Sequence, residues 1–551
     1  MELKVNREVI TVCEELYSGV QEQSTELDYI LPDYFPEIFR IIQARMEPRI
    51  ESYAISDGVL TYELCVEICV LYCAQDSPAV HCVRQKLCYT RTVELGRQCE
   101  GIAAELIPKP DYVNCRAVNQ RRIDLRGVVS VRIRATCGSQ QEVIGDIFGL
   151  HAQTRKEPVT YTARRLHGVR TFTLSEVAEL GEAKPAALQI LRTDVQLLGG
   201  DARIIAGKLA AKGDAVVRLL YSCEGGMESM QFTLPYSQIV DLEGIDDAFS
   251  CTVRPELAGC EITPAAKNDG EARSIQCELR IRLVCTAVKT AVTELVTDVF
   301  STLHPCSYTA APVRLSGCGA PVSDSGAERC TLVSKEGEIR RVYDVWCTPR
   351  NMGARVLPES GSIEVSGMLA CSVLAQSDST APVMLEQEFP FTRMLPAPED
   401  CTAAQVQVQI PACSYTLTGS DTVVLQPELR ILADTQVLRS MPLLTEVHID
   451  QEERIAPKDN CALLLYYGTA GETVWDIAKK YSTSIQAIVE ENDLTQERHA
   501  PHSLGGQEVT EWHRIFTQTL RAARTATFTS EWWGRCAPAN PPLSSGSWRP
   551  W

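Results

Sequence analysis

The chain lacks the features that mark several large classes of protein. No run of apolar residues approaches the roughly 18 that a membrane-spanning helix requires. The start, Met1 to Glu8, has no apolar segment of the kind found in secretory signals, so we expect the chain to stay in the cytoplasm that made it. Aromatic residues make up only 6% of the 551 residues, and the eight histidines are scattered. The sequence therefore favours a protein that is neither exported nor embedded in a membrane.

Catalytic motifs are missing as well. There is no H-E-x-x-H and no G-x-S-x-G motif, and Gly207-Lys208-Leu209 lacks the earlier glycine and the hydroxyl residue of a phosphate-binding loop. Asp246 and Asp247 are neighbours in sequence, yet nothing marks them as an acid–base pair. We predict that the protein is not an enzyme and that it uses no cofactor.

Basic charge is in short supply. The 53 lysines and arginines face 71 aspartates and glutamates, which gives a net charge of −18. Binding to phosphates needs a basic face, so this balance argues against nucleic acid or an anionic membrane as a partner. The apolar content of 45% and the charged content of 23% are ordinary for globular proteins. At this length we expect several domains.

Cysteine is abundant, with 23 residues, but its spacing does not predict a metal site. The best cluster is Cys65, Cys69 and Cys73. On a strand these three thiols share a face, but about 13 Å separates successive sulfurs, which is too far for one metal ion. We interpret them as small buried hydrophobic residues. Disulfides in an oxidised environment stay open as an alternative, and the sequence does not pair them.

Most of the chain consists of three diverged copies of one unit. Segments with the same residue pattern recur at an offset near 150 positions, which predicts tandem repeats of about 120 residues. The matching segments are Pro36 to Ile42 with Pro185 to Leu191, Leu71 to Cys73 with Leu220 to Ser222, Leu87 to Thr90 with Leu234 to Ser237 and Phe389 to Thr392, and Glu278 to Ile281 with Glu428 to Ile431.

The period within each copy is two. Val66, Ile68, Val70 and Tyr72 alternate with their neighbours, which is typical of a strand, and clusters of Gly, Pro and Asp separate such runs. We predict a mostly β fold of tandem antiparallel sandwich-like or barrel-like repeats. Short helices such as Asp33 to Arg45 are expected at a copy's entrance. The more polar stretches around 151–183, 304–336 and 450–461 are expected to join the units.

A different pattern follows near the end of the chain. Ala462 to Tyr467 indicates a strand, Gly471 allows a tight turn, and two short amphipathic helices follow. Thr473 can cap the first helix with Asp476 at its third position, and Thr483 can cap the second with Gln486. This segment predicts a small βααβ module.

The module resembles a LysM domain in the segment Gly471-Glu472-Thr473-Val474-Trp475-Asp476-Ile477-Ala478 and in Ile488 to Leu494. The resemblance implies a non-catalytic groove for N-acetylglucosamine-containing glycans such as peptidoglycan, between the loop before the first helix and the loop after the second. Trp475, Ile477 and Ile488 are interpreted as core. Carried over by position, the glycan- or partner-binding residues are Thr469, Ala470, Gly471, Glu472, Thr473, Asn492, Asp493 and Leu494. Leu504 to Thr510 is the candidate closing strand.

The repeats resemble the SPOCS domain of spore-coat and sporulation proteins. The resemblance rests on Leu31-Pro32-Asp33, Pro36 to Ile42, Asp57-Gly58-Val59-Leu60 and Val70-Leu71-Tyr72, and it is strongest in the first copy. It implies a non-enzymatic scaffold at the forespore surface, in the mother-cell cytoplasm. The LysM module would bind a coat morphogenetic protein, peptidoglycan, or both, and self-association is compatible with this role.

An alternative is a peptidoglycan-binding cell-wall protein without a coat role. A wall hydrolase would need a catalytic domain, for which the repeats give no motif. The predicted domains are a lead-in at 1–30, repeats at 31–150, 184–303 and 337–449, the LysM module at 462–510, and an irregular Arg/Trp/Pro tail at 511–551. The tail holds five of the seven tryptophans. It fits a disordered segment, such as a shifted reading frame would give, better than a membrane or partner-binding arm.

Overall fold

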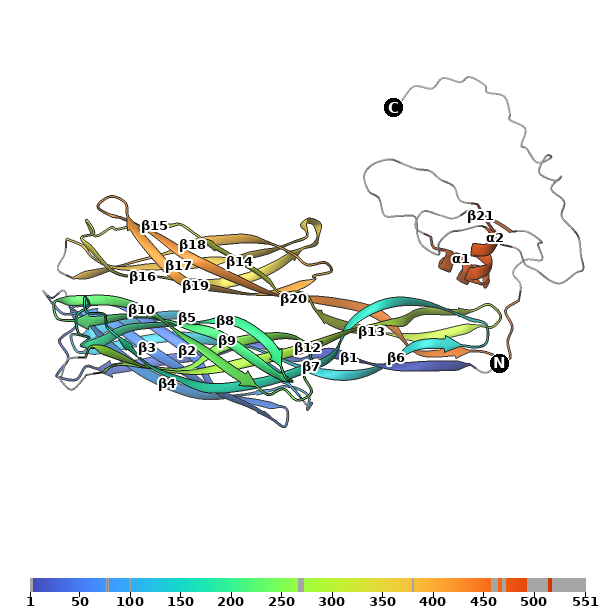
Figure 1. The fold of residues 1–551 in the computed structure, drawn as a ribbon, viewed down its shortest axis with the longest axis horizontal. Helices are drawn as coiled ribbons and strands as arrows, with labels where there is room; N and C mark the ends of the chain where they lie inside the picture. Colours follow the sequence, from blue (N-terminus) through green and yellow to red (C-terminus); the bar gives the residue numbers. More distant parts are fainter. Residues whose placement is uncertain are drawn as a thin grey trace, which may run out of the picture.

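The protein forms a long β structure with a thick head at one end and a narrow stalk at the other (Figure 1). The computed structural model describes residues 3–75, 77, 79–99, 101–265, 272–378, 381–456, 464–467, 472–492 and 514–517. Long strands run from the head into the stalk, and the N terminus lies at the stalk end. Two short helices lie near the same end of the molecule.

Three repeats with the same strand order build the head and the stalk. The first repeat comprises β1 (Lys4–Ile30), β2 (Arg40–Ser56), β3 (Val59–Cys73), β4 (Val80–Glu94), β5 (Ala103–Asn119) and β6 (Arg122–Phe148). The second comprises β7 (Ala152–Glu179), β8 (Gln189–Ile205), β9 (Lys208–Cys223), β10 (Gly226–Val240), β11 (Ser250–Ala265) and β12 (Ser274–Ser301). In the third repeat three strands replace the first long strand: β13 (Cys306–Cys318), β14 (Val322–Ala327) and β15 (Cys330–Val333). The rest of this repeat comprises β16 (Arg341–Leu357), β17 (Ser362–Gln376), β18 (Pro382–Pro396), β19 (Ala403–Leu417) and β20 (Thr422–Ile449), with a 3-10 turn at Pro358–Ser360.

Each repeat is a sandwich of two antiparallel sheets, as the sequence predicts. In the first repeat one sheet has the order β2-β3-β4 and the other β1-β6-β5, and the other two repeats follow the same plan. The alternation in β3 places Leu64, Val66, Ile68 and Val70 in the core, where they pack against Ile123 to Ala135 of β6. The prediction of tandem antiparallel β repeats is confirmed.

The predicted helix at Asp33 to Arg45 is wrong. Residues 31–39 form turns and bends, and β2 begins at Arg40. Pro32 and Pro36 lack the backbone N–H of a helix, and Ile41 and Ile42 are β-branched. The Leu31 N–H donates to the carbonyl of Arg121, and the Ile38 N–H donates to that of Gln120. These bonds close the entrance segment over the end of the sandwich.

The strand pairing reaches beyond the predicted repeat boundaries. Residues 1–30 were expected as a lead-in, but β1 pairs with β6 from Lys4↔Phe148 to Ile30↔Arg122. The stretch 151–183, expected as a join, contains β7, which pairs along β12. Likewise 304–336 contains β13, β14 and β15, all paired with β20. Each of these strands therefore belongs to the sandwich that follows its expected join.

The stalk consists of three two-stranded ribbons packed around a common apolar centre. It comprises residues 4–12, 141–148, 152–161, 293–301, 306–315 and 439–449. The ribbon positions equivalent by strand pairing meet there: Ile10, Val159 and Val313 from the first strands, and Val143, Leu295 and Leu443 from the last. All six side chains are at most 1% exposed. The three repeats therefore surround the stalk centre in equivalent ways.

The centre of the head is also shared by the three repeats. Leu71, Leu220 and Leu374 occupy equivalent places on the middle strands β3, β9 and β17, and they belong to one buried cluster. Leu191 of β8 joins this cluster, with Ile42 and Tyr343 packed against it. These three sit at the same irregularity in register of β2, β8 and β16.

The C-terminal module contains β21 (Leu464–Tyr467), α1 (Val474–Tyr481), α2 (Ile485–Glu491) and β22 (Arg514–Thr517). Most of the predicted irregular tail lies outside the described residues, but β22 is a strand within it. The candidate closing strand Leu504 to Thr510 also lies outside them. No helix in the described part of the chain has the length and apolar content to cross a membrane.

Candidate functional site

The first helix of the C-terminal module begins as the sequence predicts. The Thr473 hydroxyl accepts a hydrogen bond from the Asp476 N–H at 3.2 Å, and the Asp476 carboxylate accepts from the Thr473 N–H at 3.0 Å. This reciprocal pair satisfies two N–H groups at the helix start. The pKa of Asp476 lies below its usual value because hydrogen bonds from Thr473 favour the ionised form. The cap fixes where the preceding loop ends.

The second helix starts one residue later than predicted. Ser484, and not Thr483, is its N-cap, and the Ser484 hydroxyl accepts from the Ala487 N–H at 3.0 Å. Ser482 adopts the left-handed conformation that ends α1, at φ 51°. Three residues, 482–484, therefore connect the two helices, so the start of α1 and the end of α2 both lie away from this connection.

The two strands of the module pair with each other. β21 and β22 are antiparallel, with Leu464 opposite Thr517 and Tyr467 opposite Arg514. The closing strand thus lies at 514–517, beyond the predicted end of the module at 510. The order strand, helix, helix, strand agrees with the predicted βααβ arrangement.

Three of the eight predicted contact residues lie in the described part of the chain. The Glu472 carboxylate accepts a hydrogen bond from the Tyr466 hydroxyl at 2.6 Å, which joins the loop before α1 to β21. Thr473 is 8% exposed, and its side chain is engaged in the cap. Asn492, the C-cap of α2, donates to the Ile488 carbonyl at 2.8 Å. Thr469, Ala470, Gly471, Asp493 and Leu494 lie outside the described residues.

The core of the module continues into the stalk. Ile477 and Ile488 are buried in one cluster, as the sequence predicts, and Ala478 joins them. Trp475 is buried too, but it packs on Phe300 of β12, with ring centroids 5.1 Å apart in an edge-to-face arrangement. The Trp475 Nε1–H donates to the Asp298 carboxylate at 2.8 Å. Trp475 therefore lies at a contact between module and stalk.

Lys479, one turn after Trp475, reaches the same carboxylate. Its ammonium donates to both oxygens of Asp298, at 2.6 Å and 2.9 Å, and lies 5.3 Å from the centre of the Tyr308 ring. Burial raises the pKa of Asp298, but hydrogen bonds from Lys479, Trp475 and Tyr308 outweigh it and leave the pKa below its usual value. Asp298 is therefore held as an anion between β12, β13 and α1.

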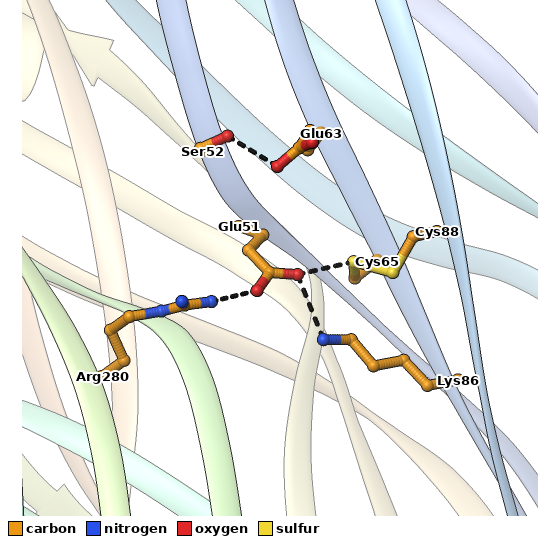
Figure 2. The surroundings of a disulfide bond; sticks show 7 residues. All are labelled: Glu51, Ser52, Glu63, Cys65, Lys86, Cys88 and Arg280. Carbon is orange, nitrogen blue, oxygen red and sulfur yellow. Dashed lines mark hydrogen bonds and ion pairs between the residues drawn. A yellow bond between two sulfur atoms is a disulfide. The ribbon is translucent and has the colours of Figure 1, made fainter.

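A disulfide joins Cys65 of β3 to Cys88 of β4, which face each other directly across the two strands (Figure 2). The nearby Glu51 accepts hydrogen bonds from Lys86 and, across the repeat boundary, from Arg280. Glu51, Cys65 and Cys88 lie close enough together to be considered as metal ligands. With the two sulfurs bonded and Glu51 paired with two cations, this cluster fits a structural cross-link.

The other cysteines of the predicted cluster have separate neighbours. The sulfur of Cys69 lies 3.4 Å from that of Cys82, and the Cys73 thiol lies 3.6 Å from the Arg40 carbonyl. The three sulfurs of Cys65, Cys69 and Cys73 thus lie in three different environments. The sequence could not have paired Cys65 with Cys88, because that pairing depends on the register of β3 and β4.

Sequence reasoning missed the residues of the stalk that hold the module: Asp298, Phe300 and Tyr308. A signal for two of them exists. Asp298-Val299-Phe300 matches Asp146-Ile147-Phe148 of the first repeat at an offset of 152. The match marks equivalent places at the ends of β12 and β6, but nothing in it indicates contact with a distant helix.

Comparison with known proteins agrees with both resemblances. Residues 186–264 match the family model described as SipL, SPOCS domain, and residues 469–498 match that of the LysM domain. The SPOCS match covers most of the head part of the second repeat, whereas the sequence motif is strongest in the first. No curated protein and no solved structure matches the chain.

The chain therefore combines a SPOCS-type β repeat with a C-terminal LysM module. These two domains associate it with sporulation and with the binding of peptidoglycan.

Proposed function

We propose that this chain is a non-enzymatic scaffold of the spore coat, which acts in the mother cell at the forespore surface. Its three-repeat framework provides length and surface for protein contacts. Its LysM module binds a coat morphogenetic protein or peptidoglycan. The SPOCS match in the second repeat supports the sporulation role, and the shared strand order extends that type of fold to the other two repeats.

One observation carries the binding role. The LysM match spans residues 469–498, which include all eight predicted contact residues in the loops before α1 and after α2. Of the three described contact residues in these loops, Thr473 is buried as the cap of α1, whereas Glu472 and Asn492 are only partly buried and adjoin the helix ends that face away from the connection at 482–484. The start of α1 and the end of α2 thus lie at the helix ends opposite to their connection, which suits a binding groove formed by the two predicted loops.

The non-enzymatic role rests on the nature of the clustered polar groups. Those in the head pair with one another, both across the repeats, as Arg45 does with Asp194 at 3.1 Å, and within one repeat, as Arg49 does with Glu67 at 2.8 Å. Such pairs neutralise each other and hold surfaces together. The excess of acidic residues supports a partner other than nucleic acid.

A pull-down of the full chain with insoluble peptidoglycan tests the choice of ligand. Retention that chito-oligosaccharide competes away would support glycan binding, and would favour the alternative of a peptidoglycan-binding protein without a coat role. No retention of the folded chain would leave the coat-protein partner. Capture of the chain by coat extracts from sporulating cells, without competition by the oligosaccharide, is the result that the scaffold role requires.

Matched variants assign the binding to the loops. Asp493→Asn changes a predicted contact residue after α2, and Glu490→Gln removes the same type of charge from the exposed face of α2. We expect at least a fivefold loss of partner or glycan binding for Asp493→Asn, as for loss of a charged hydrogen bond, and little change for Glu490→Gln. Equal binding by both variants would exclude the loop after α2 from the site.

A further inference from the structure

The end of the stalk presents the same acidic and aromatic pair on two repeats. In β6 these are Asp146 and Phe148, and in β12 they are Asp298 and Phe300. Both ribbons have a register irregularity next to the aspartate, and in both one carboxylate oxygen accepts the N–H of the following residue, at 2.9 Å from Ile147 and 2.8 Å from Val299. The two aspartates thus project from the same local backbone arrangement.

The two aspartates differ in the residue that the following repeat places beside them. Lys156 of β7 donates to the Asp146 carboxylate at 2.7 Å. The position of the third repeat equivalent to Lys156 is Ala310 of β13, because Lys156 pairs with Val296 and Ala310 with the equivalent Leu444. Alanine carries no charge, so at this position β13 provides no ion pair to Asp298 like the one that Lys156 of β7 makes with Asp146. Lys479 of α1 supplies an ammonium group at Asp298 instead.

The aromatic residues follow the same division. Phe148 is 49% exposed, whereas Phe300, beneath Trp475, is 5% exposed. In the first repeat, the Asp146 carboxylate is therefore paired with Lys156 of the stalk, and the Phe148 ring is largely uncovered. The second repeat has both groups covered by one helix, through a lysine and a tryptophan spaced four residues apart on the same face.

We propose that Ala310 selects the second repeat as the docking site of the LysM module, and that Asp298 is the positioning residue of that module. Because Asp146 already pairs with Lys156, a helix bearing Trp475 and Lys479 would gain no ion pair there. Asp298 has Ala310 in place of that lysine, so the helix gains a charge-assisted contact with both carboxylate oxygens. The module is then a fixed extension of the stalk, with its two loops held in one direction. This inference goes beyond the proposed function and holds for either ligand.

Side-chain footprinting of the full chain with hydroxyl radicals tests the proposal, because it reports the solvent exposure of individual aromatic side chains. In Ala310→Lys the new ammonium competes with Lys479 for Asp298, so the module undocks. We expect oxidation of Phe300 to rise toward that of Phe148 in the same sample, by up to the roughly tenfold ratio of their exposed fractions, 49% and 5%. Oxidation of Trp475 rises with it.

The matched control is Ala310→Met, which places an uncharged side chain of similar length at the same exposed position. It should leave Phe300 protected. In a Lys479→Met background, where the ion pair is already gone, Ala310→Lys should add little to the oxidation of Phe300.

Unchanged protection of Phe300 in Ala310→Lys would overturn the proposal, and so would equal exposure of Phe300 in Ala310→Lys and Ala310→Met. Misfolding is recognised separately, because it would also raise the oxidation of Tyr62, a residue of the first repeat's core that is 1% exposed. Loss of docking with ligand binding intact would leave the proposed function standing, so the two conclusions can fail independently.

Discussion

The centres of the stalk and of the head are built by the same three repeats, but their side chains differ in kind. In the stalk, equivalent positions hold apolar residues in every repeat, as with Val143, Leu295 and Leu443. In the head, one set of equivalent positions on β2, β8 and β16 holds Arg45, Asp194 and Trp346. Apolar packing holds three ribbons together without distinguishing them, whereas charges of opposite sign distinguish one neighbour from another.

The charged residues of the head link all three repeats. Asp194 of the second repeat accepts from Arg45 of the first at 3.1 Å and pairs with Arg192 at 2.7 Å. The Arg192 guanidinium lies 3.4 Å from the ring centre of Trp346, in the third repeat. We infer that the head fixes the order in which the repeats adjoin, and that the stalk supplies mainly apolar cohesion.

The largest expected effect is the loss of Asp194. In Asp194→Ala two arginines lose their shared anion, and Arg192, which is 4% exposed, is left as a buried charge. We expect the free energy of unfolding, measured by urea titration, to fall by about 3–5 kcal/mol. Asp201→Ala is the control, because its pair with Arg203 is 68% and 74% exposed; it should cost about 1 kcal/mol or less. Similar losses for the two variants would contradict a specifying role for the head centre.

A smaller effect, confined to the head, is a dependence on pH. Burial raises the pKa of Asp344 to about 6, although Arg192 opposes this shift. A carboxyl with a raised pKa binds its proton more tightly in the folded state, so stability is highest below the ordinary pKa near 4 and falls as the pH rises to about 6. We expect Asp344 to account for a loss of about 2–3 kcal/mol over this range.

Comparison with Asp344→Asn isolates this contribution, because the amide does not titrate. The difference in unfolding free energy between the two proteins, measured from pH 4 to pH 7, should change by the stated amount. The subtraction also removes the opposite contribution of Asp194, whose pKa is lowered to about 2. A constant difference across the range would show that Asp344 titrates normally.

The sequence predicts the interior of each sandwich better than its edges and contacts. The alternation from Val66 to Tyr72 identifies a buried strand, because a core on one face imposes a period of two. The sequence did not predict β7 as a strand, because both of its faces are largely polar. Its pairing with β12 identifies it as a strand. The helix predicted at Asp33 to Arg45 was wrong because distant residues fix this segment: the Ile38 N–H donates to the carbonyl of Gln120.

The module shows the same division between local and distant information. The cap at Thr473 depends on residues three positions apart, so the sequence predicts it. The contact of Trp475 with Asp298 joins residues 177 positions apart and depends on the register of a ribbon end. Local pattern therefore predicts the helices and their core, but not the surface on which they rest.

The smallest expected effect tests whether the stalk positions are interchangeable. Leu295 is fully buried, yet the equivalent position of the first repeat holds Val143. Leu295→Val removes one methylene from a centre that already accommodates valine, so we expect a loss of about 1 kcal/mol in the free energy of unfolding. The matching exchange in the head, Asp194→Arg, introduces the residue of the first repeat and places like charges beside Arg192. It should cost at least as much as Asp194→Ala. If both exchanges cost about the same, the contrast between an interchangeable stalk and a specifying head would be wrong.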